Sequence, residues 1–88
     1  MKVCVKLFAT LTQNVSEGIK ARYPQGIRAG YPLEVEVPDG SILADLVDSL
    51  TLPREKIRVA FVNGRAQKLD YRLVPGDEVG IFPPVGGG

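Results

Sequence analysis

The C-terminal end of the chain holds the residues whose types and spacing most directly imply chemistry. The sequence ends in three glycines, and the proline pair Pro83-Pro84 stands shortly before them. Glycine has no side chain to bury and loses the most conformational entropy on ordering, so a glycine end has little structural value. Two prolines impose a stiff and extended course on the backbone. The combination indicates a segment that presents the C-terminal carboxylate of Gly88 to another protein.

The composition removes several classes of self-contained active site. The 88 residues include no histidine and a single cysteine, Cys4. Histidine-dependent nucleophiles, the usual zinc sites and iron–sulfur clusters with about four thiolates are therefore excluded. Asp45 and Asp48 stand three residues apart on a predicted helix, and we interpret them as a solvated helix face rather than an acid–base pair. We expect no metal site, no bound cofactor and no enzymatic activity of the chain on its own.

Size and charge narrow the class of protein further. Eighty-eight residues provide one modest hydrophobic core, and the net charge of +1 does not indicate a broad surface for nucleic acid or membrane. No apolar run is long enough to span a bilayer, and the N-terminal residues lack a signal-peptide pattern. A lone cysteine rules out an internal disulfide. These features predict a single cytoplasmic domain.

The hydrophobic pattern predicts an α+β domain with one main helix laid across a sheet. Strict alternation of apolar residues indicates half-buried strands, whereas Ile42, Leu46, Val47 and Leu50 recur at helical spacing. Ser41 is the predicted N-cap of this helix. Pro53 is expected to end it. The predicted strands are residues 2–8, 33–37, 57–62 and 78–83, with a short additional strand at 67–69, so that the sheet has four or five strands.

A long connection separates the first two predicted strands. Residues 12–32 contain several glycines and prolines. This connection is far longer than the two to five residues of a usual hairpin loop. Lys20, Arg22 and Arg28 outnumber the single acidic residue Glu17, so this stretch is locally basic. It is either a mobile excursion or a loop that contacts a partner, and a solvated loop is the simpler interpretation.

The element order and the glycine end together resemble the ubiquitin-like β-grasp fold. The sequence is similar in particular to the small subunit of molybdopterin synthase, within the MoaD/ThiS family of sulfur carriers. The matching segments are residues 6–9 (Lys-Leu-Phe-Ala), 62–64 (Val-Asn-Gly), 75–79 (Pro-Gly-Asp-Glu-Val) and 81–88 (Ile-Phe-Pro-Pro-Val-Gly-Gly-Gly). The chain departs from this family in its long loop at 12–32, and in Gly86, where many members carry threonine or serine.

The resemblance implies a chemistry for the last residue. In such carriers, an adenylyltransferase of the ubiquitin-activating type uses ATP to adenylate the C-terminal carboxylate. A sulfur donor enzyme then leaves a thiocarboxylate, here on Gly88, and the large subunit of molybdopterin synthase takes the sulfur for a pterin precursor of the molybdenum or tungsten cofactor. Gly86 and Gly87 would thread a narrow channel of the partner, since glycine allows the closest approach of other atoms. The domain would span residues 1–83, with 84–88 as a flexible tail.

Strand alternation predicts where a partner would dock. If the inner face of the first strand is Val3, Val5 and Leu7, then Phe8 points away from the helix, and the same parity directs Phe82 outward. The first and last strands of a β-grasp sheet are parallel neighbours, so both rings would lie beside the root of the tail, unless the long loop covers one of them. Phe61 is placed inward with Val59 by alternation, and a shift of one residue would bring it into the same patch.

The predicted docking residues are therefore Phe8, Phe82, Pro83 and Pro84, with Phe61 joining them under the shifted register. Cys4 is either a second sulfur relay or an inert strand cysteine, and the second interpretation is favoured because no cation is placed to activate the thiol. Two further functions remain open at this point. One is a carrier for thiamin or cysteine synthesis, or a ubiquitin-like modifier; the other is a β-grasp binding module without carrier chemistry.

Overall fold

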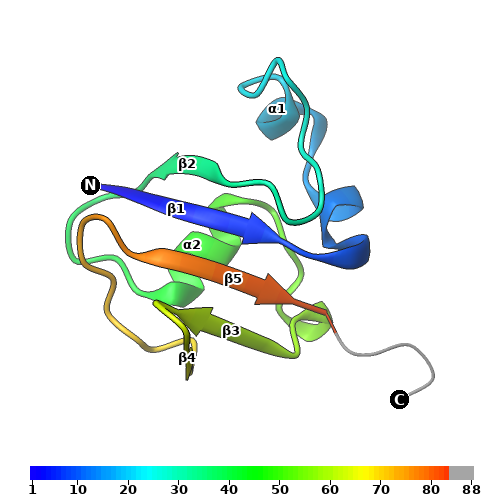
Figure 1. The fold of residues 1–88 in the computed structure, drawn as a ribbon. Helices are drawn as coiled ribbons and strands as arrows, with labels where there is room; N and C mark the ends of the chain where they lie inside the picture. Colours follow the sequence, from blue (N-terminus) through cyan, green and yellow to red (C-terminus); the bar gives the residue numbers. More distant parts are fainter. Residues whose placement is uncertain (84–88) are drawn as a thin grey trace.

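The computed structural model describes residues 1–83, which form a five-stranded mixed sheet crossed by one main helix (Figure 1). The strand order is β2-β1-β5-β3-β4. The expected β-grasp architecture is confirmed, with the fifth strand present. The strands are β1 (Lys2–Leu7), β2 (Leu33–Glu36), β3 (Val59–Val62), β4 (Arg65–Gln67) and β5 (Glu78–Phe82); the helices are α1 (Glu17–Lys20), α2 (Leu43–Ser49) and the 3₁₀ turns η1 (Ala9–Asn14) and η2 (Arg54–Lys56).

The first and last strands lie side by side at the centre of the sheet and run parallel. Val5 is paired with Val79, and Leu7 with Ile81, in the β1–β5 register. β2 and β3 flank this pair in antiparallel orientation. Successive side chains of a strand point to opposite faces, and the burial of β1 and β5 alternates as the sequence predicts. One face of the sheet therefore meets α2, and the other face is left open.

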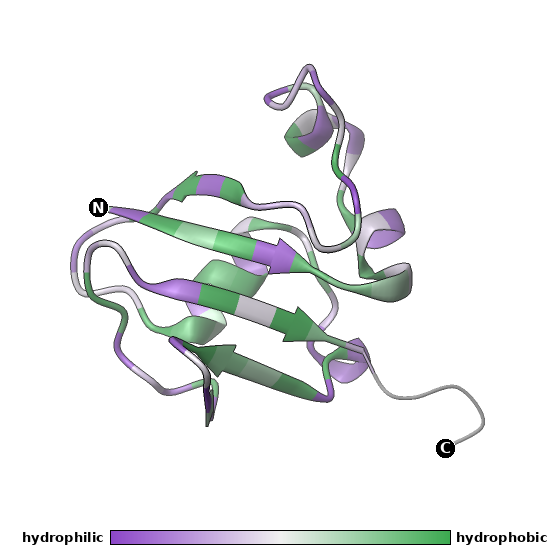
Figure 2. Cartoon of the chain, in the orientation of Figure 1, coloured by the Kyte–Doolittle hydropathy of each residue, from purple (hydrophilic) through white to green (hydrophobic). Residues whose placement is uncertain are grey.

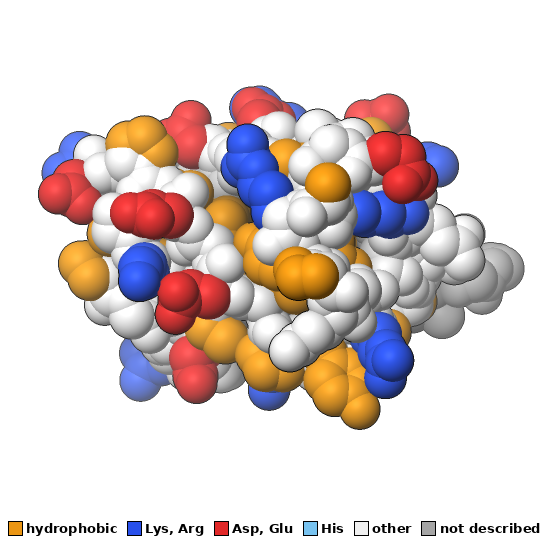
Figure 3. All heavy atoms as spheres, turned by 90° about the horizontal axis from the view of Figure 1, so that it is seen from above, with side chains coloured by type: hydrophobic (Ala, Val, Ile, Leu, Met, Phe, Trp, Pro, Cys, Tyr) orange, Lys and Arg blue, Asp and Glu red, His pale blue; other side chains and the backbone are white. Residues whose placement is uncertain are grey.

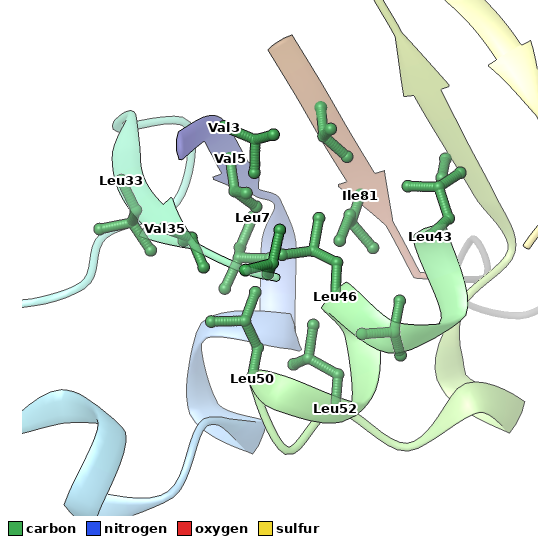
Figure 4. Packing of buried hydrophobic residues seen from close by; sticks show 14 of the residues in the cluster. Val3, Val5, Leu7, Leu33, Val35, Leu43, Leu46, Leu50, Leu52 and Ile81 are labelled. Atoms are coloured by element: carbon green, nitrogen blue, oxygen red, sulfur yellow. The ribbon is translucent and has the colours of Figure 1, made fainter. Parts of the chain in front are cut away.

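The hydrophobic core fills the space between the sheet and α2 (Figure 4), and hydrophobic positions recur along α2 and the central strands (Figure 2). Leu7, Leu43, Leu46 and Ile81 are fully buried, with 0% of their surfaces exposed. Burial of one such side chain contributes about 1.5–3 kcal/mol to folding. The other buried residues drawn and labelled with them are Val3, Val5, Leu33, Val35, Leu50 and Leu52.

The start of α2 differs from the prediction by one residue. The hydroxyl of Ser41 donates to the carbonyl oxygen of Pro38 at 2.7 Å, and Ser41 stands one residue before the N-cap position. Ile42 stands at the N-cap position, and its backbone N–H donates to the Asp45 carboxylate at 2.9 Å. The predicted cap at Ser41 is wrong because the helix begins one residue later than predicted; the Asp45 carboxylate, favourable near a helix N-terminus, accepts the N–H of the actual N-cap residue.

The inward placement predicted for Phe61 is also wrong. Ala60 and Val62 are the buried residues of β3, whereas Phe61 is half-buried on the open face. The register with β5 explains this outcome, because Ala60 is paired with Ile81, and Phe61 with Gly80. A small residue thus faces the crowded core, and the large ring lies over a glycine.

The turn of the hairpin after β3 is shorter than predicted. Asn63 and Gly64 both adopt left-handed backbone conformations, with φ of 52° and 85°. Two consecutive residues of positive φ make the two-residue turn whose twist matches that of a hairpin. β4 therefore begins directly at Arg65, two residues before the strand predicted at 67–69.

The long connection is more ordered than a solvated loop. η1 leads into it, and α1 forms a single turn within it; its residue Val15 is buried in the core, as is Leu11 directly before it. The Tyr23 hydroxyl donates to the carbonyl oxygen of Glu34 at 2.9 Å, which ties the connection to β2. Figure 1 shows this segment extending from the sheet beside β2. The expectation of a solvated loop is thus corrected for the residues that enter the core.

Candidate functional site

Three phenylalanine rings gather on the open face of the sheet, where β5 ends. The rings of Phe8 and Phe82 are stacked, with centroids 4.2 Å apart and planes 3° from parallel. Phe61 meets Phe82 edge-on, with centroids 5.6 Å apart and planes at 85°. Each aromatic pair of this kind contributes about 0.5–1.5 kcal/mol beyond its buried area. We call these three residues the aromatic patch.

Gly80 lies beneath the aromatic patch and was missed by sequence reasoning. A Cβ atom added there would be 3.5 Å from ring atoms of both Phe8 and Phe82, an ordinary van der Waals contact. Gly80 is paired with Lys6 on one side and with Phe61 on the other. Both rings therefore pack close over the backbone of Gly80. The alternation pattern could have located this glycine on the open face, but only the cross-strand register shows which rings surround it.

The aromatic patch borders a shallow groove of about 220 Å³. Its rim is mixed in character, because Lys6 and Glu78 are exposed and Cys4 is half-buried. A surface of apolar rings with a charged rim is typical of a protein–protein contact. The lining residues are Cys4, Lys6, Phe8, Phe61, Gly64, Glu78, Val79, Gly80 and Phe82.

Backbone hydrogen bonds hold the end of β5 from both sides. The N–H of Phe8 donates to the carbonyl oxygen of Ile81 at 3.2 Å, and the N–H of Arg58 donates to that of Phe82 at 2.8 Å. Pro83 follows and is half-buried. The last residues of the described chain therefore leave the sheet from a fixed point beside the aromatic patch.

A buried carboxylate organises the opposite, N-terminal end of β5. Only 2% of the surface of Asp77 is exposed. Its oxygens accept hydrogen bonds from the Asn63 side chain at 2.9 Å, the Val74 N–H at 2.9 Å and the Tyr71 hydroxyl at 3.3 Å. Burial, together with the neighbouring Asp77 carboxylate, raises the pKa of Tyr71. The Asn-Gly and Pro-Gly-Asp motifs thus act together as a structural clamp, a role that the sequence alone did not reveal.

The structure brings together the predicted docking residues that lie within its described range. Phe8 and Phe82 meet as expected, Phe61 joins them, and Pro83 comes next in the chain. The long connection reaches one edge of this set, because a Cβ atom at Gly30 would be 3.7 Å from the Phe8 ring. Pro84, Gly86, Gly87 and Gly88 lie outside the described residues.

The remaining candidates for chemistry are distributed over the surface. Asp45 and Asp48 are both exposed, as predicted, and Arg54 binds the Asp48 carboxylate at 2.7 Å. This hydrogen bond lowers the pKa of Asp48. Within residues 1–83, no group of three or more potential metal-ligating side chains comes together. Over the same range, no helix has the length and apolar character needed to cross a membrane.

Comparison with known proteins places the chain in a family. The model of the ThiS family matches residues 21–88, which is most of the chain. No match is found among curated proteins. Among solved structures, a putative molybdopterin converting factor, subunit 1, from Pyrococcus furiosus is 29% identical, with a TM-score of 0.64 over 97% of this chain and 99% of that one.

Two further structures share the fold at lower identity. Small archaeal modifier protein 1 from Haloferax volcanii is 24% identical, with a TM-score of 0.64 over 96% of this chain and 98% of its own. A chain in the complex of subunits 1 and 2 of molybdopterin-converting factor from Helicobacter pylori is 18% identical, with a TM-score of 0.57 over 100% of both chains. Together with the extent of the family match, the fold supports one conclusion: this chain belongs to the ThiS family and has a ubiquitin-like fold.

Proposed function

We propose that this protein carries sulfur to a pterin precursor, as the small subunit of a molybdopterin synthase in molybdenum or tungsten cofactor synthesis. The observation that carries the proposal is the aromatic patch at the end of β5. It places an apolar docking surface at the residue from which the glycine-ended segment continues. A partner that binds the patch can thereby receive the C-terminus in a defined direction.

The segment after the described domain has the reach that this role needs. From Pro84 to Gly88, an extended chain of five residues spans about 16.5–18 Å at 3.3–3.6 Å per residue. We propose that residues 1–83 stay outside the partner while 84–88 enter its channel, with Gly86 and Gly87 lining the narrowest part. Glycine lets backbone and nucleotide atoms approach where a side chain would collide.

The chain itself would be a co-substrate rather than an enzyme. The carboxylate of Gly88 is ionised at neutral pH and is a poor electrophile. A ubiquitin-activating type adenylyltransferase would join it to AMP from ATP, with release of pyrophosphate. Sulfide sulfur from a donor enzyme would then displace AMP and form the thiocarboxylate. No cofactor need be bound by this chain, and its own residues supply docking and presentation.

The pterin pathway is favoured over thiamin synthesis by two features. The Phe-Pro-Pro-Val sequence at 82–85 resembles molybdopterin synthase small subunits more than thiamin carriers. The Pyrococcus furiosus protein, 29% identical over nearly the whole of both chains, is described as a putative molybdopterin converting factor subunit. The large subunit of the synthase is accordingly the acceptor that we propose.

The test of the pathway is a transfer assay with two acceptors. The thiocarboxylated chain is supplied to a molybdopterin synthase large subunit with its pterin precursor and, separately, to a thiazole synthase with its substrates. We expect loss of the terminal sulfur and formation of molybdopterin with the first acceptor alone. Transfer only to thiazole synthase would contradict the pterin assignment while leaving the carrier chemistry in place.

Deletion of Gly87 and Gly88 separates carriers from plain binding modules. A carrier loses all sulfur transfer on deletion, whereas a β-grasp binding module retains its partner affinity and its biological function. Thermal unfolding serves as the control. We expect it to be unchanged, because the buried core is contributed by residues between Val3 and Ile81.

A further inference from the structure

The long connection carries the surplus positive charge of the molecule. Residues 12–32 hold three basic residues and one acidic residue, a net charge of +2, whereas the whole chain has a net charge of +1. The rest of the chain is therefore acidic on balance. Lys20 forms an ion pair with Glu17 at 3.8 Å. Within residues 1–83, Arg22 and Arg28 form no ion pair, and both are exposed.

These two arginines line an open groove of about 510 Å³ between the long connection and the start of β2. We call it the basic groove. The Arg28 guanidinium lies 5.7 Å from the centre of the Tyr31 ring, and 59% of the surface of Tyr31 is exposed, the most of any large hydrophobic residue between positions 1 and 83. The hydrogen bond from Tyr23 to Glu34 fixes one wall. Figure 3, which views the molecule from the side of this connection, shows basic side chains beside exposed hydrophobic ones.

The chemistry of the basic groove fits an acidic segment of a protein. A guanidinium offers a planar pair of donors that matches a carboxylate, and exposed tyrosine adds a large apolar surface at low entropic cost. Arg and Tyr are also the residue types enriched where binding energy concentrates. A nucleic acid fits less well, because the net charge of the chain is only +1, whereas binding of nucleic acid relies on several phosphate contacts.

Gly30 links the basic groove to the aromatic patch. The N–H of Gly30 donates to the carbonyl oxygen of Leu7 at 2.8 Å, directly before Phe8 in the chain. Gly30 borders the Phe8 ring on this side, and Tyr31, next in sequence, lines the basic groove. One partner can therefore cover both surfaces while it holds the C-terminal segment.

We propose that the basic groove binds an acidic segment of the adenylating enzyme and so selects this carrier for activation; this rests on the function proposed above. Discrimination between carriers needs a difference outside the features that they share. A β-grasp core and a glycine end are features that such carriers share, whereas the basic groove is a local surface formed by the side chains of the connection and the start of β2. Adenylation is the first committed step, so a contact made there prevents activation by the wrong enzyme.

The test compares adenylation kinetics of charge-reversed variants with the purified adenylating enzyme of the source organism. In R22E/R28E we expect the KM for the carrier to rise about tenfold at low salt with kcat unchanged, since rim charges act mainly on encounter and affinity. The difference should shrink at high salt. R65E/R72E is the matched control, because it makes the same charge change at two exposed sites outside both surfaces, and its KM should stay at the wild-type value.

Each result decides between the proposals. An unchanged KM in R22E/R28E, or an equal rise in R65E/R72E, overturns the assignment of the basic groove. So does a defect confined to binding of the synthase large subunit. Far-UV circular dichroism and thermal unfolding check that the variants are folded. The Y31A variant, which leaves the charge unchanged, should by itself raise the KM several-fold. If the wild-type chain is not adenylated at all, the proposed function fails. If the wild-type chain is adenylated and the R22E/R28E variant has the same KM, the assignment of the basic groove alone is refuted.

Discussion

The aromatic patch and the basic groove both expose aromatic rings, but they are built in opposite ways. The rings of the patch come from β1, β3 and β5, whose backbones are paired in one sheet. Those of the groove come from turns that follow the single helical turn α1. The first surface is positioned by main-chain ladders, whereas the second depends on a few side-chain anchors such as Leu11, Val15 and Tyr23. A substitution at one anchor should therefore disturb the groove while the patch stays intact.

Leu11→Ala tests the anchoring most strongly. Leu11 is fully buried, so its truncation should lower the free energy of unfolding by about 3 kcal/mol. Urea unfolding followed by circular dichroism measures the loss. Val74→Ala is the control, because Val74 is 51% exposed and its truncation should change stability by less than about 0.5 kcal/mol. Equal stabilities of the two variants would mean that the connection is not anchored in the core.

Asp77→Ala tests the hydrogen-bonded clamp at the N-terminal end of β5, the strand that carries Phe82 of the aromatic patch. The substitution leaves the Val74 N–H and the Asn63 amide without their acceptor, which should cost about 2 kcal/mol of unfolding free energy. Chemical denaturation gives the value, and Asp70→Ala, at an exposed aspartate in the nearby turn, serves as the control. A loss no greater than that of the control would refute a structural role for the buried carboxylate.

Phe82→Ala separates the two surfaces by function. Removal of the ring breaks both aromatic contacts of the patch, and the affinity for the synthase large subunit should fall about tenfold. Isothermal titration calorimetry measures the Kd. Tyr31→Ala removes a ring of the groove instead and should leave this Kd within about twofold of wild type, by the usual size of effects outside an interface centre. Equal losses in the two variants would show that the large subunit does not distinguish the surfaces.

Tyr23→Phe should have the smallest effect. It removes the hydrogen bond to the Glu34 carbonyl and should lower stability by about 0.5–1 kcal/mol. Burial raises the pKa of Tyr23 above its ordinary 10.0, so the unfolded chain loses the phenolic proton first as the pH rises. The stability difference between wild type and variant should be constant below pH 10 and decline above it. A difference that grows with rising pH would contradict this linkage.

Sequence patterns could predict the parts of the molecule that depend on local periodicity. Alternation in β1 and β5 placed Phe8 and Phe82 correctly, because a half-buried strand shows its two faces directly. β3 defeated the same argument: its residues are apolar on both faces, so alternation does not distinguish Phe61 from Ala60. There the cross-strand partner Gly80 decides which residue faces outward.

Long-range contacts account for what the sequence did not reveal. The acceptor role of Asp77 joins turns 14 residues apart, and the Tyr23 anchor bridges 11 residues. Neither has a periodic signal, since each depends on the fold being formed first. For the basic groove, the only signal in the sequence was the positive charge of the connection.

The central claim is tested most directly by mass spectrometry of the C-terminus. The chain is incubated with ATP, a sulfur donor and the adenylating enzyme of the source organism, and both the intact protein and its C-terminal fragment are analysed. Oxidation of Met1 or Cys4 gives nearly the same mass change as exchange of one oxygen for sulfur, so the change must be localised to Gly88. We predict sulfur on Gly88, dependent on ATP. An unmodified C-terminus, with an enzyme shown to be competent, would contradict the carrier function and favour a β-grasp binding module.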